Sequence, residues 1–238
     1  MILCGRACRS FAAEGTIRRV KLPPHHIRVL LLGLALGAPA AQAVELTVSV
    51  SDVQGRPAHN VVVIATPKAA VSVPARPATM VEMDQVDRQF APYVLAVHTG
   101  TPVLFVNNDS VAHQVYSFSP PKRFELALYH GKPRAPVVFD QPGIVTVGCN
   151  IHDNMVGYLY VTDAPWFGIT NKDGIWKAHD LPAGDYELQV WTPLLPPHEW
   201  LLTQNVAIGD AATRASFTLK RALRPEPVPI KDKRVRDY

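Results

Sequence analysis

Three residues of types that bind soft metal ions lie within one short segment of this chain. Cys149, His152 and Met155 form a Cys-x2-His-x2-Met cluster after a β-type run, and an isolated His113 lies upstream. Two imidazoles and one thiolate in a trigonal plane, with a weak axial thioether, form the ligand set of a blue-copper electron-transfer centre. The cluster therefore predicts one copper ion held by these four residues.

Other chemistries are possible for a cysteine close to a histidine. Zinc could use His113, Cys149, His152 and Asp153, but structural zinc usually has four Cys or His ligands and catalytic zinc has three plus water. A Cys-His nucleophile would lack an orienting Asn and a thiol-protease signature. A buried cysteine beside an unrelated exposed histidine is a third possibility. The second histidine and Met155 favour copper over all three.

The first 43 residues have the pattern of a secretory signal peptide. A basic lead precedes the apolar run Val29–Leu36, and Ala41-Gln42-Ala43 is a small-residue cleavage site. The apolar run is shorter than the about 20 residues that a membrane-spanning helix needs. We therefore predict that residues 1–43 are removed and that the mature protein is periplasmic.

Removal of this segment changes both the charge and the cysteine content. It contains 6 of the 24 Lys and Arg residues and 1 of the 20 Asp and Glu residues, which leaves 18 basic and 19 acidic residues. The high isoelectric point therefore gives no indication of nucleic-acid binding. Cys4 and Cys8 leave with the segment, so Cys149 has no partner for an intramolecular disulfide. Metal ligation is the simplest reason for a lone thiol in an oxidising compartment.

The rest of the chain consists of short β-type runs separated by turn residues, without a convincing helical period. This pattern predicts an all-β protein of sandwich or barrel type. We predict a first domain at 44–162, a small second sandwich at 163–220 and a disordered basic tail at 221–238. Within the second domain, Phe167–Thr170 and Ile175–Ala178 look like the strands of a hairpin.

The segment from about residue 83 to residue 161 resembles the cupredoxins, the family of plastocyanin, pseudoazurin and amicyanin. The resemblance lies in Phe105–Asp109 before the first histidine, in Pro142-Gly143 before the strand that ends in cysteine, and in the amicyanin-like spacing of the Cys-x2-His-x2-Met loop. It implies a Greek-key β-sandwich that binds one type 1 copper ion. The implied ligands are His113, Cys149, His152 and Met155.

The whole chain after residue 43 also resembles bacterial proteins labelled methylamine utilization protein. That label does not establish a role in amine oxidation. The shared motifs are Met83-Asp84-Gln85, Tyr116-Ser117-Phe118-Ser119 and Gly148–Asp153. For Met83 and Gln85 we weigh a position near the copper against packing in the core, which is the commoner role of Met.

Residues 163–219 resemble the transthyretin-like, carboxypeptidase-regulatory type of β-sandwich. The resemblance rests on the turn segments Thr170–Gly174 and Leu181–Tyr186. It implies a small β-sandwich for this part of the chain.

Two positions of the predicted ligand loops differ from the usual cupredoxin pattern. Gln114 stands where many cupredoxins have Asn, and its backbone N–H can still reach the thiolate sulfur. Ile151 stands where Pro is common, so Cys149 is expected to accept a second backbone hydrogen bond. Hydrogen bonds to the sulfur stabilise the thiolate and tune the reduction potential.

The leading functional prediction is a one-electron carrier that serves a redox protein such as a c-type cytochrome or a dehydrogenase. A small, weak contact suits rapid exchange. The alternative is a copper-binding or delivery module without electron-transfer turnover, for which a transthyretin-like docking domain fits equally well. Neither domain shows a substrate-processing site, so we do not predict an enzyme. His152 is the predicted exit port, and the apolar patch expected around it comprises Val111, Ala112, Pro120, Pro121 and Ile151.

Overall fold

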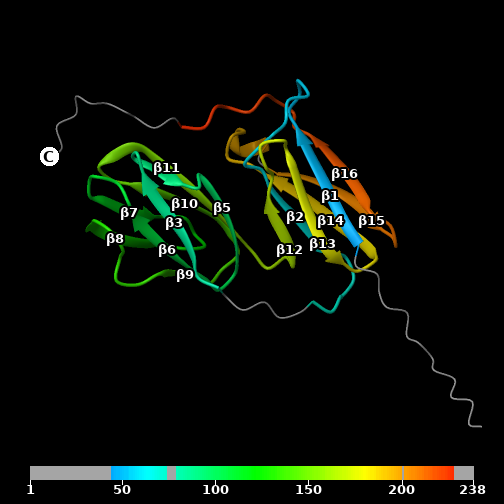
Figure 1. The fold of residues 1–238 in the computed structure, drawn as a ribbon, viewed down its shortest axis with the longest axis horizontal. Coiled ribbons are helices and arrows are strands. Elements are labelled where there is room, and N and C mark those ends of the chain that lie inside the picture. The colour runs from blue at the N-terminus through cyan, green and yellow to red at the C-terminus, as the bar shows by residue number, and fades with distance from the viewer. Residues whose placement is uncertain (1–43, 74–78, 200, 228–238) are drawn as a thin grey trace, which may run out of the picture. The chain divides into compact units, whose positions relative to one another are not determined.

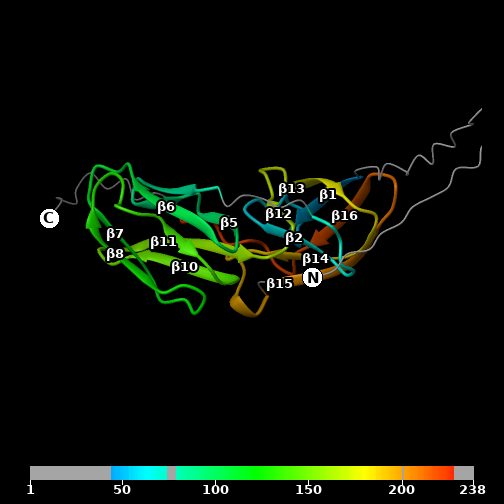
Figure 2. The same ribbon diagram turned by 90° about the horizontal axis from the view of Figure 1, so that it is seen from below.

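The computed structural model describes residues 44–73, 79–199 and 201–227. Over these ranges the chain forms β-strands and one short 3-10 helix, η1 (Pro197–Glu199), which confirms the predicted all-β fold. Figures 1 and 2 show the strands in two groups, and each group consists of two sheets. The predicted signal peptide at 1–43 and residues 228–238 of the predicted tail lie outside the described residues.

The first sandwich, built from residues 81–162, carries the predicted metal ligands. Its two sheets have the strand orders β4-β3-β6-β9 and β5-β11-β10-β7-β8. Met83 and Phe105 of the first sheet share one core with Val147 and Leu159 of the second. The first sheet contains β3 (Val81–Val86), β4 (Gln89–Ala91), β6 (Thr101–Asn107) and β9 (Val137–Phe139), and the second contains β5 (Val94–His98), β7 (His113–Ser117), β8 (Phe124–Tyr129), β10 (Gly143–Cys149) and β11 (His152–Thr162).

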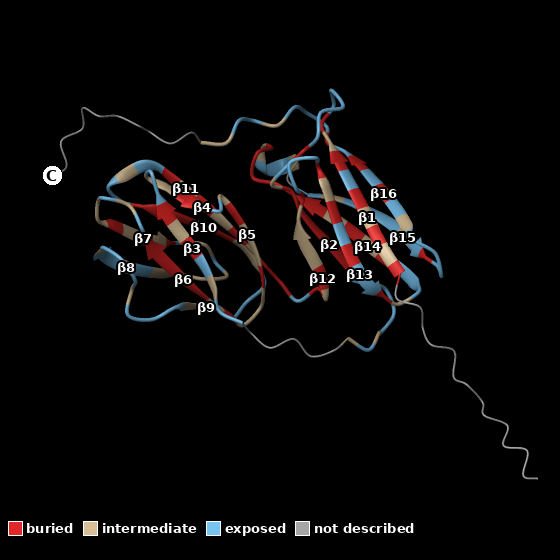
Figure 3. Cartoon of the chain, viewed as in Figure 1, coloured by how far each residue is buried: buried red, intermediate tan, exposed pale blue. Residues whose placement is uncertain are grey.

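The second sandwich combines strands from both ends of the described chain. Its sheets have the orders β13-β1-β16 and β12-β2-β14-β15. Buried residues alternate with more exposed ones along β1, as Figure 3 shows, and Leu46 and Val48 share a core with Tyr186 and Leu188 of the opposite sheet. The strands are β1 (Val44–Ser51), β2 (Val62–Pro67), β12 (Trp166–Ile169), β13 (Ile175–Leu181), β14 (Gly184–Trp191), β15 (Leu201–Ile208) and β16 (Thr213–Thr218).

The predicted start of the first domain at residue 44 is wrong, because β1 and β2 pair with strands of the second sandwich. β1 is antiparallel to β13 and parallel to β16, and β2 lies between β12 and β14. The alternation of apolar and polar residues along a strand predicts which face is buried, but it does not identify the neighbouring strand. The sandwich predicted at 163–220 is therefore completed by residues 44–67.

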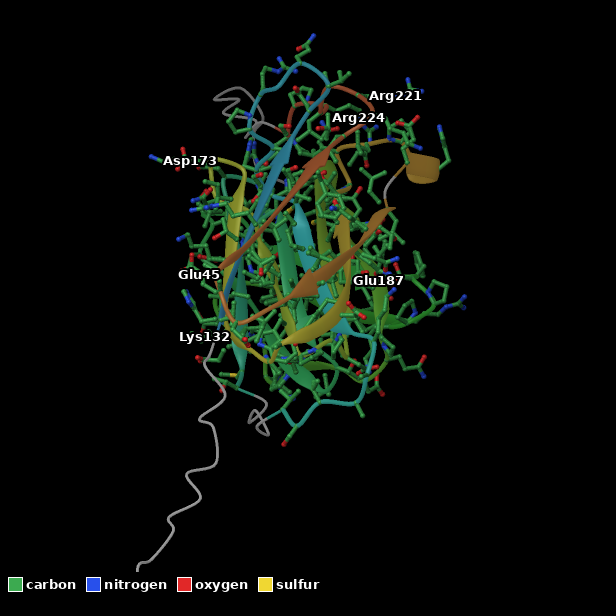
Figure 4. All side chains as sticks on the ribbon, turned by 90° about the vertical axis from the view of Figure 1, so that its right-hand side faces the viewer. Glu45, Lys132, Asp173, Glu187, Arg221 and Arg224 are labelled. Atoms are coloured by element: carbon green, nitrogen blue, oxygen red, sulfur yellow. The ribbon has the colours of Figure 1, made fainter. Side chains whose placement is uncertain are left out.

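The prediction of a disordered tail is wrong at its start, where residues 221–227 contact the second sandwich. Arg224 donates hydrogen bonds to the backbone carbonyls of Pro193–Leu195. Nε of Arg221 donates to both carboxylate oxygens of Glu199, at 3.0 and 2.9 Å, and Figure 4 labels both arginines. The charged side chains that suggested a solvated tail therefore bind residues 221–227 to the second sandwich.

The segment 167–178 turns as predicted but does not form a hairpin. The turn is closed by a hydrogen bond from the N–H of Gly174 to the carbonyl of Asn171. β12, before the turn, pairs with β2, whereas β13, after it, pairs with β1 in the other sheet. The turn therefore carries the chain from one sheet of the second sandwich to the other.

Gly174→Ala is expected to lower the free energy of unfolding by about 3 kcal/mol. The φ of Gly174 is +71°, and an added Cβ would lie 2.3 Å from the carbonyl oxygen of Val50. The left-handed conformation costs a non-glycine residue about 1–2 kcal/mol, and an added steric clash costs about 1–3 kcal/mol. Gly55→Ala is the matched control, because Gly55 also has a positive φ (+76°) but has nothing within 4 Å of the added Cβ. Denaturant unfolding measures the free energy of unfolding of both variants. An equal loss in Gly174→Ala and Gly55→Ala would contradict the predicted clash with Val50.

Candidate metal centre

The three predicted nitrogen and thiolate ligands lie at the ends of neighbouring strands. His113 is the first residue of β7, Cys149 the last of β10 and His152 the first of β11. β10 lies between β7 and β11 in the sheet, as can be followed in Figure 1. The register slips between Gly148 and Cys149, which places Cys149 opposite His152. The topology therefore gathers ligands from distant parts of the sequence at one end of the sheet.

The three donor atoms lie close enough together to bind one metal ion. Sγ of Cys149 lies 3.7 Å from Nδ1 of His113 and 3.7 Å from Nδ1 of His152. All three donor atoms lie within 4.8 Å of one another. Nitrogen and sulfur donors at about 2.0 and 2.3 Å from one ion, as in zinc sites, are about 3.5–3.8 Å apart in a trigonal plane. The two sulfur–nitrogen distances therefore match those expected around one such metal ion.

The ligands differ in their access to solvent. His113 is 0% exposed and Cys149 is 3% exposed, whereas His152 is half-buried. Met155 is 1% exposed and belongs to the hydrophobic cluster that also contains Cys149. Its role as the axial ligand stays a prediction. Of the four predicted ligands, His152 has the most direct access to solvent.

The surroundings of Cys149 favour its thiolate. Burial by itself raises the pKa of the thiol, but the hydrogen bond with His113 and the backbone N–H groups of Gln114 and Ile151 outweigh burial, so that the pKa is lowered. The two backbone donors predicted from the sequence are thus both present. The thiolate is the form of cysteine that binds metal ions.

Asp109 forms a hydrogen bond with Nε2 of His113, the ring nitrogen that does not face Cys149. Oδ2 of Asp109 lies 2.9 Å from Nε2 of His113 and also accepts the backbone N–H of Arg88 at 2.7 Å. Burial disfavours the charged form of both side chains, yet the hydrogen bonds with Cys149 and Asp109 raise the pKa of His113, and the bond with His113 lowers the pKa of Asp109. A carboxylate in this position keeps the imidazole proton at Nε2, which leaves Nδ1 free to bind a metal.

Asn107 organises the loop that carries Asp109 and the first histidine. Its side chain is buried, its Nδ2 donates to the carbonyls of Val111 and Tyr129, and its Oδ1 accepts the N–H of Asp109. Hydrogen bonds of the Asn107 side chain therefore fix the conformation of this loop. Sequence analysis included Asn107 and Asp109 in the segment Phe105–Asp109 that resembles cupredoxins, but it assigned neither residue a role at the site. An acidic residue four positions before a predicted histidine ligand was the available signal.

The ring of Tyr116 lies close to Gly148. Tyr116 lies opposite Gly148 in the β7–β10 ladder, and a Cβ on Gly148 would lie 3.2 Å from the ring atom Cζ and from the hydroxyl oxygen. Phe118 is 75% exposed, and its ring centroid lies 5.1 Å from that of Tyr116. An aromatic surface therefore lies directly outside the residue that precedes Cys149.

The predicted apolar patch is only partly correct. Ile151, within the ligand loop, is 54% exposed, as predicted. Pro121 instead lies against Gly143, at the opposite end of the seven-residue strand β10 from Cys149. Because strands rise about 3.3 Å per residue, the two ends of β10 are about 20 Å apart. The proline pair at 120–121 is therefore too far from the ligands to belong to their patch.

Comparisons with known proteins give cupredoxin-like structures that align with part of this chain. No protein-family model and no curated protein matches it. A purple cupredoxin from Nitrosopumilus maritimus is 24% identical, with a TM-score of 0.31, over 34% of this chain and 98% of its own. An oxidised amicyanin variant is 17% identical, with a TM-score of 0.32, over 42% of this chain and 99% of its own. A copper-containing nitrite reductase from Thermus scotoductus is 28% identical, with a TM-score of 0.34, over 41% of this chain and 25% of its own.

Proposed function

We propose that this protein is a periplasmic type 1 copper protein of the cupredoxin kind, which carries single electrons between redox partners. The trigonal arrangement of Sγ of Cys149 with Nδ1 of His113 and of His152, beside the buried Met155, supports this most strongly. A thiolate, two imidazoles and a thioether form a soft donor set that suits copper better than harder ions. A bound copper ion would supply a couple that gains and loses one electron.

The surrounding residues favour a site whose geometry changes little. The carboxylate of Asp109 fixes the ring of His113, and Asn107 fixes the loop that carries both. Preorganised supporting contacts hold ligands in one geometry, which keeps the rearrangement between two oxidation states small. His152, half-buried and next to the exposed Ile151, is then the residue through which electrons enter and leave.

The proposed partner is a redox protein such as a c-type cytochrome or a dehydrogenase. The exposed Ile151 of the ligand loop is apolar, and the pair Tyr116 and Phe118 near Gly148 is aromatic, so both offer contact surface close to Cys149. Weak electron-transfer complexes use small interfaces of this kind. Across the ranges that the structure describes, no helix is both long enough and apolar enough to cross a membrane.

We propose a carrier rather than an enzyme because protein donors can fill the coordination positions of the metal. Catalytic metal sites keep one position open for water or substrate. Here three donors lie at trigonal spacing, and the thioether of Met155 is the proposed fourth. The site therefore suits electron exchange better than substrate binding.

The second candidate function is copper binding or delivery without electron-transfer turnover. The observation that favours it is the second sandwich, which has its own core and can serve as a docking element. A carrier retains copper against moderate competing ligands, whereas a delivery protein releases Cu(I) to a specific acceptor. Transfer of Cu(I) to an acceptor protein, measured against a competing chelator, discriminates between the two functions.

Titration with Cu(II) followed by voltammetry tests the proposed function. We expect the protein from residue 44 onward to bind one equivalent of Cu(II), to develop an intense visible thiolate-to-copper band and to show a reversible one-electron wave. A copper-loaded protein without a reversible wave would contradict the carrier role. Binding of copper only as Cu(I), without the visible band, would favour delivery.

A further inference from the structure

A row of side chains on the outer face of one sheet forms an apolar groove beside the metal centre. Val156, Gly148 and Tyr116 are ladder partners on the neighbouring strands β11, β10 and β7. The residue before each of them belongs to the core, so the row itself points away from the core. The groove has a volume of about 320 Å³, and its lining also includes Phe118, which is 75% exposed. The described residues therefore leave an aromatic surface open to solvent.

The same row continues onto β8 with a negative charge. Glu125 is the ladder partner of Tyr116 and is exposed, and Nε2 of Gln114 donates a hydrogen bond to its carboxylate at 2.6 Å. Neighbouring strands are about 4.8 Å apart, so Val156 and Tyr116 are about 10 Å apart and Glu125 lies about 5 Å further on. The groove is therefore apolar along its length and acidic at its β8 end.

The C-terminal segment is fixed near the opposite end of this row. In addition to the bonds of Arg224 with the second sandwich, Oε1 of Glu226 lies 3.0 Å from Nε2 of His59. Arg224 and Pro227 line a second hollow, of about 500 Å³, and Val156 lines it as well. Because Val156 lines both the hollow and the groove, Pro227, the last described residue, lies one hollow away from the row.

The sequence after Pro227 suits this groove in length and chemistry. Residues 228–238 begin with the apolar segment Val228–Ile230, and the basic stretch 231–234 follows. Prolines at every second position, as between 225 and 229, are typical of polyproline II, which rises about 3.1 Å per residue. These residues therefore span about 34 Å when extended, which is more than twice the roughly 15 Å of the row. Proline-rich segments in this conformation bind aromatic-lined grooves with little loss of entropy.

We propose that the C-terminal tail is an intramolecular ligand of this groove, in which Val228–Ile230 packs along the apolar row and the basic stretch 231–234 reaches Glu125. The short tether gives the tail an effective concentration in the millimolar range, so a weak contact is enough to hold it. The docked tail covers Tyr116 and Phe118, and a redox partner that contacts these rings must displace it. Only this last consequence rests on the proposed function.

Nuclear magnetic resonance of the metal-free chain from residue 44 onward tests this proposal. A chain that ends at Pro227 is the reference without the tail, and its signals of Val156 and Tyr116 are expected to differ from those of the full chain. Ile230→Asp in the full chain is expected to lower the equilibrium constant for docking by at least about tenfold, because a charged side chain replaces a buried isoleucine. The signals of the row then move toward those of the shortened chain.

Val235→Asp is the matched control, because it adds the same charge to the same tail beyond the docked segment. It should change the docking constant by less than about twofold. Equal effects of the two tail variants would overturn the proposal, as would a shortened chain whose signals at the row match those of the full chain. Signals that change with protein concentration would show that a second copy fills the groove, which would also overturn it. Because none of these measurements uses bound copper, each of these outcomes leaves the proposed function as it stands.

Discussion

Cys149→Ser is expected to abolish the thiolate-to-copper band and to weaken Cu(II) binding by more than about 100-fold. Loss of an outer hydrogen-bond partner alone typically costs 10–100-fold in metal affinity, and here a ligand atom itself is exchanged. The serine hydroxyl is a harder donor that keeps its proton, whereas the surroundings of Cys149 lower the pKa of its thiol. Competition titration with a Cu(II) chelator, together with the visible spectrum, measures both effects.

The control for this substitution is Met83→Leu. Met83 is a second buried sulfur residue of the cluster that contains Cys149, but it is not a predicted ligand. The leucine variant should keep both the band and the affinity, while thermal unfolding shows that both metal-free variants are folded. A visible band that survives in Cys149→Ser would contradict the assignment of this cysteine as the thiolate ligand. Loss of the band in Met83→Leu would show that the band depends on core packing rather than on the thiolate ligand alone.

The Cys-x2-His-x2-Met cluster is the part of the site that sequence could predict most directly, because its pattern is local. Cys149, His152 and Met155 lie within one short segment at a spacing that few other chemistries explain. The backbone donors Gln114 and Ile151 were also predictable, since each directly follows a predicted ligand or lies between two of them. The Ile151 contact depends on chain connectivity, whereas the Gln114 contact also requires β7 to lie beside β10.

The same reasoning could not predict which strands pair with one another. The alternation in Val44–Ser51 predicts a half-buried strand correctly, but its neighbours β13 and β16 come from the far end of the chain. The turn at 171–174 was also recognised, although the strands on its two sides enter different sheets. Turn residues specify a local change of direction. Which sheet receives each strand depends on long-range packing that local patterns do not encode.

The hydrogen bonds that support the metal ligands could be predicted from the sequence only in part. The carboxylate of Asp109 is close to His113 in sequence, but its second partner is the N–H of Arg88, at the tip of the β3–β4 turn. Asp87 and Arg88 both have positive φ values, 51° and 58°, and Arg88 stands at the second turn position, where Gly is the usual residue. A contact that depends on an unusual turn in a separate strand pair requires the structure itself.

Asp109→Asn is expected to weaken Cu(II) binding by about 10–100-fold, the usual effect of removing a hydrogen-bond partner of a metal-bound histidine. The oxygen of Asp109 accepts from both Nε2 of His113 and the N–H of Arg88. An amide at this position must keep its oxygen toward one of them, and it carries no charge with which to hold the imidazole proton at Nε2. Nδ1 of His113 is then protonated in part of the molecules, and copper must displace that proton.

Asp153→Asn is the matched control for the loss of one negative charge. Asp153 directly follows His152 and is exposed, so it changes the net charge near the site without touching the ring of His113. Competition titration of both variants should show the large loss only in Asp109→Asn, and the nitrogen chemical shifts of His113 in the metal-free protein should show its proton moving from Nε2. Equal affinities in the two variants would mean that Asp109 acts only through its charge. An unchanged tautomer combined with a large loss of affinity would instead indicate that Asp109 positions the loop rather than the proton.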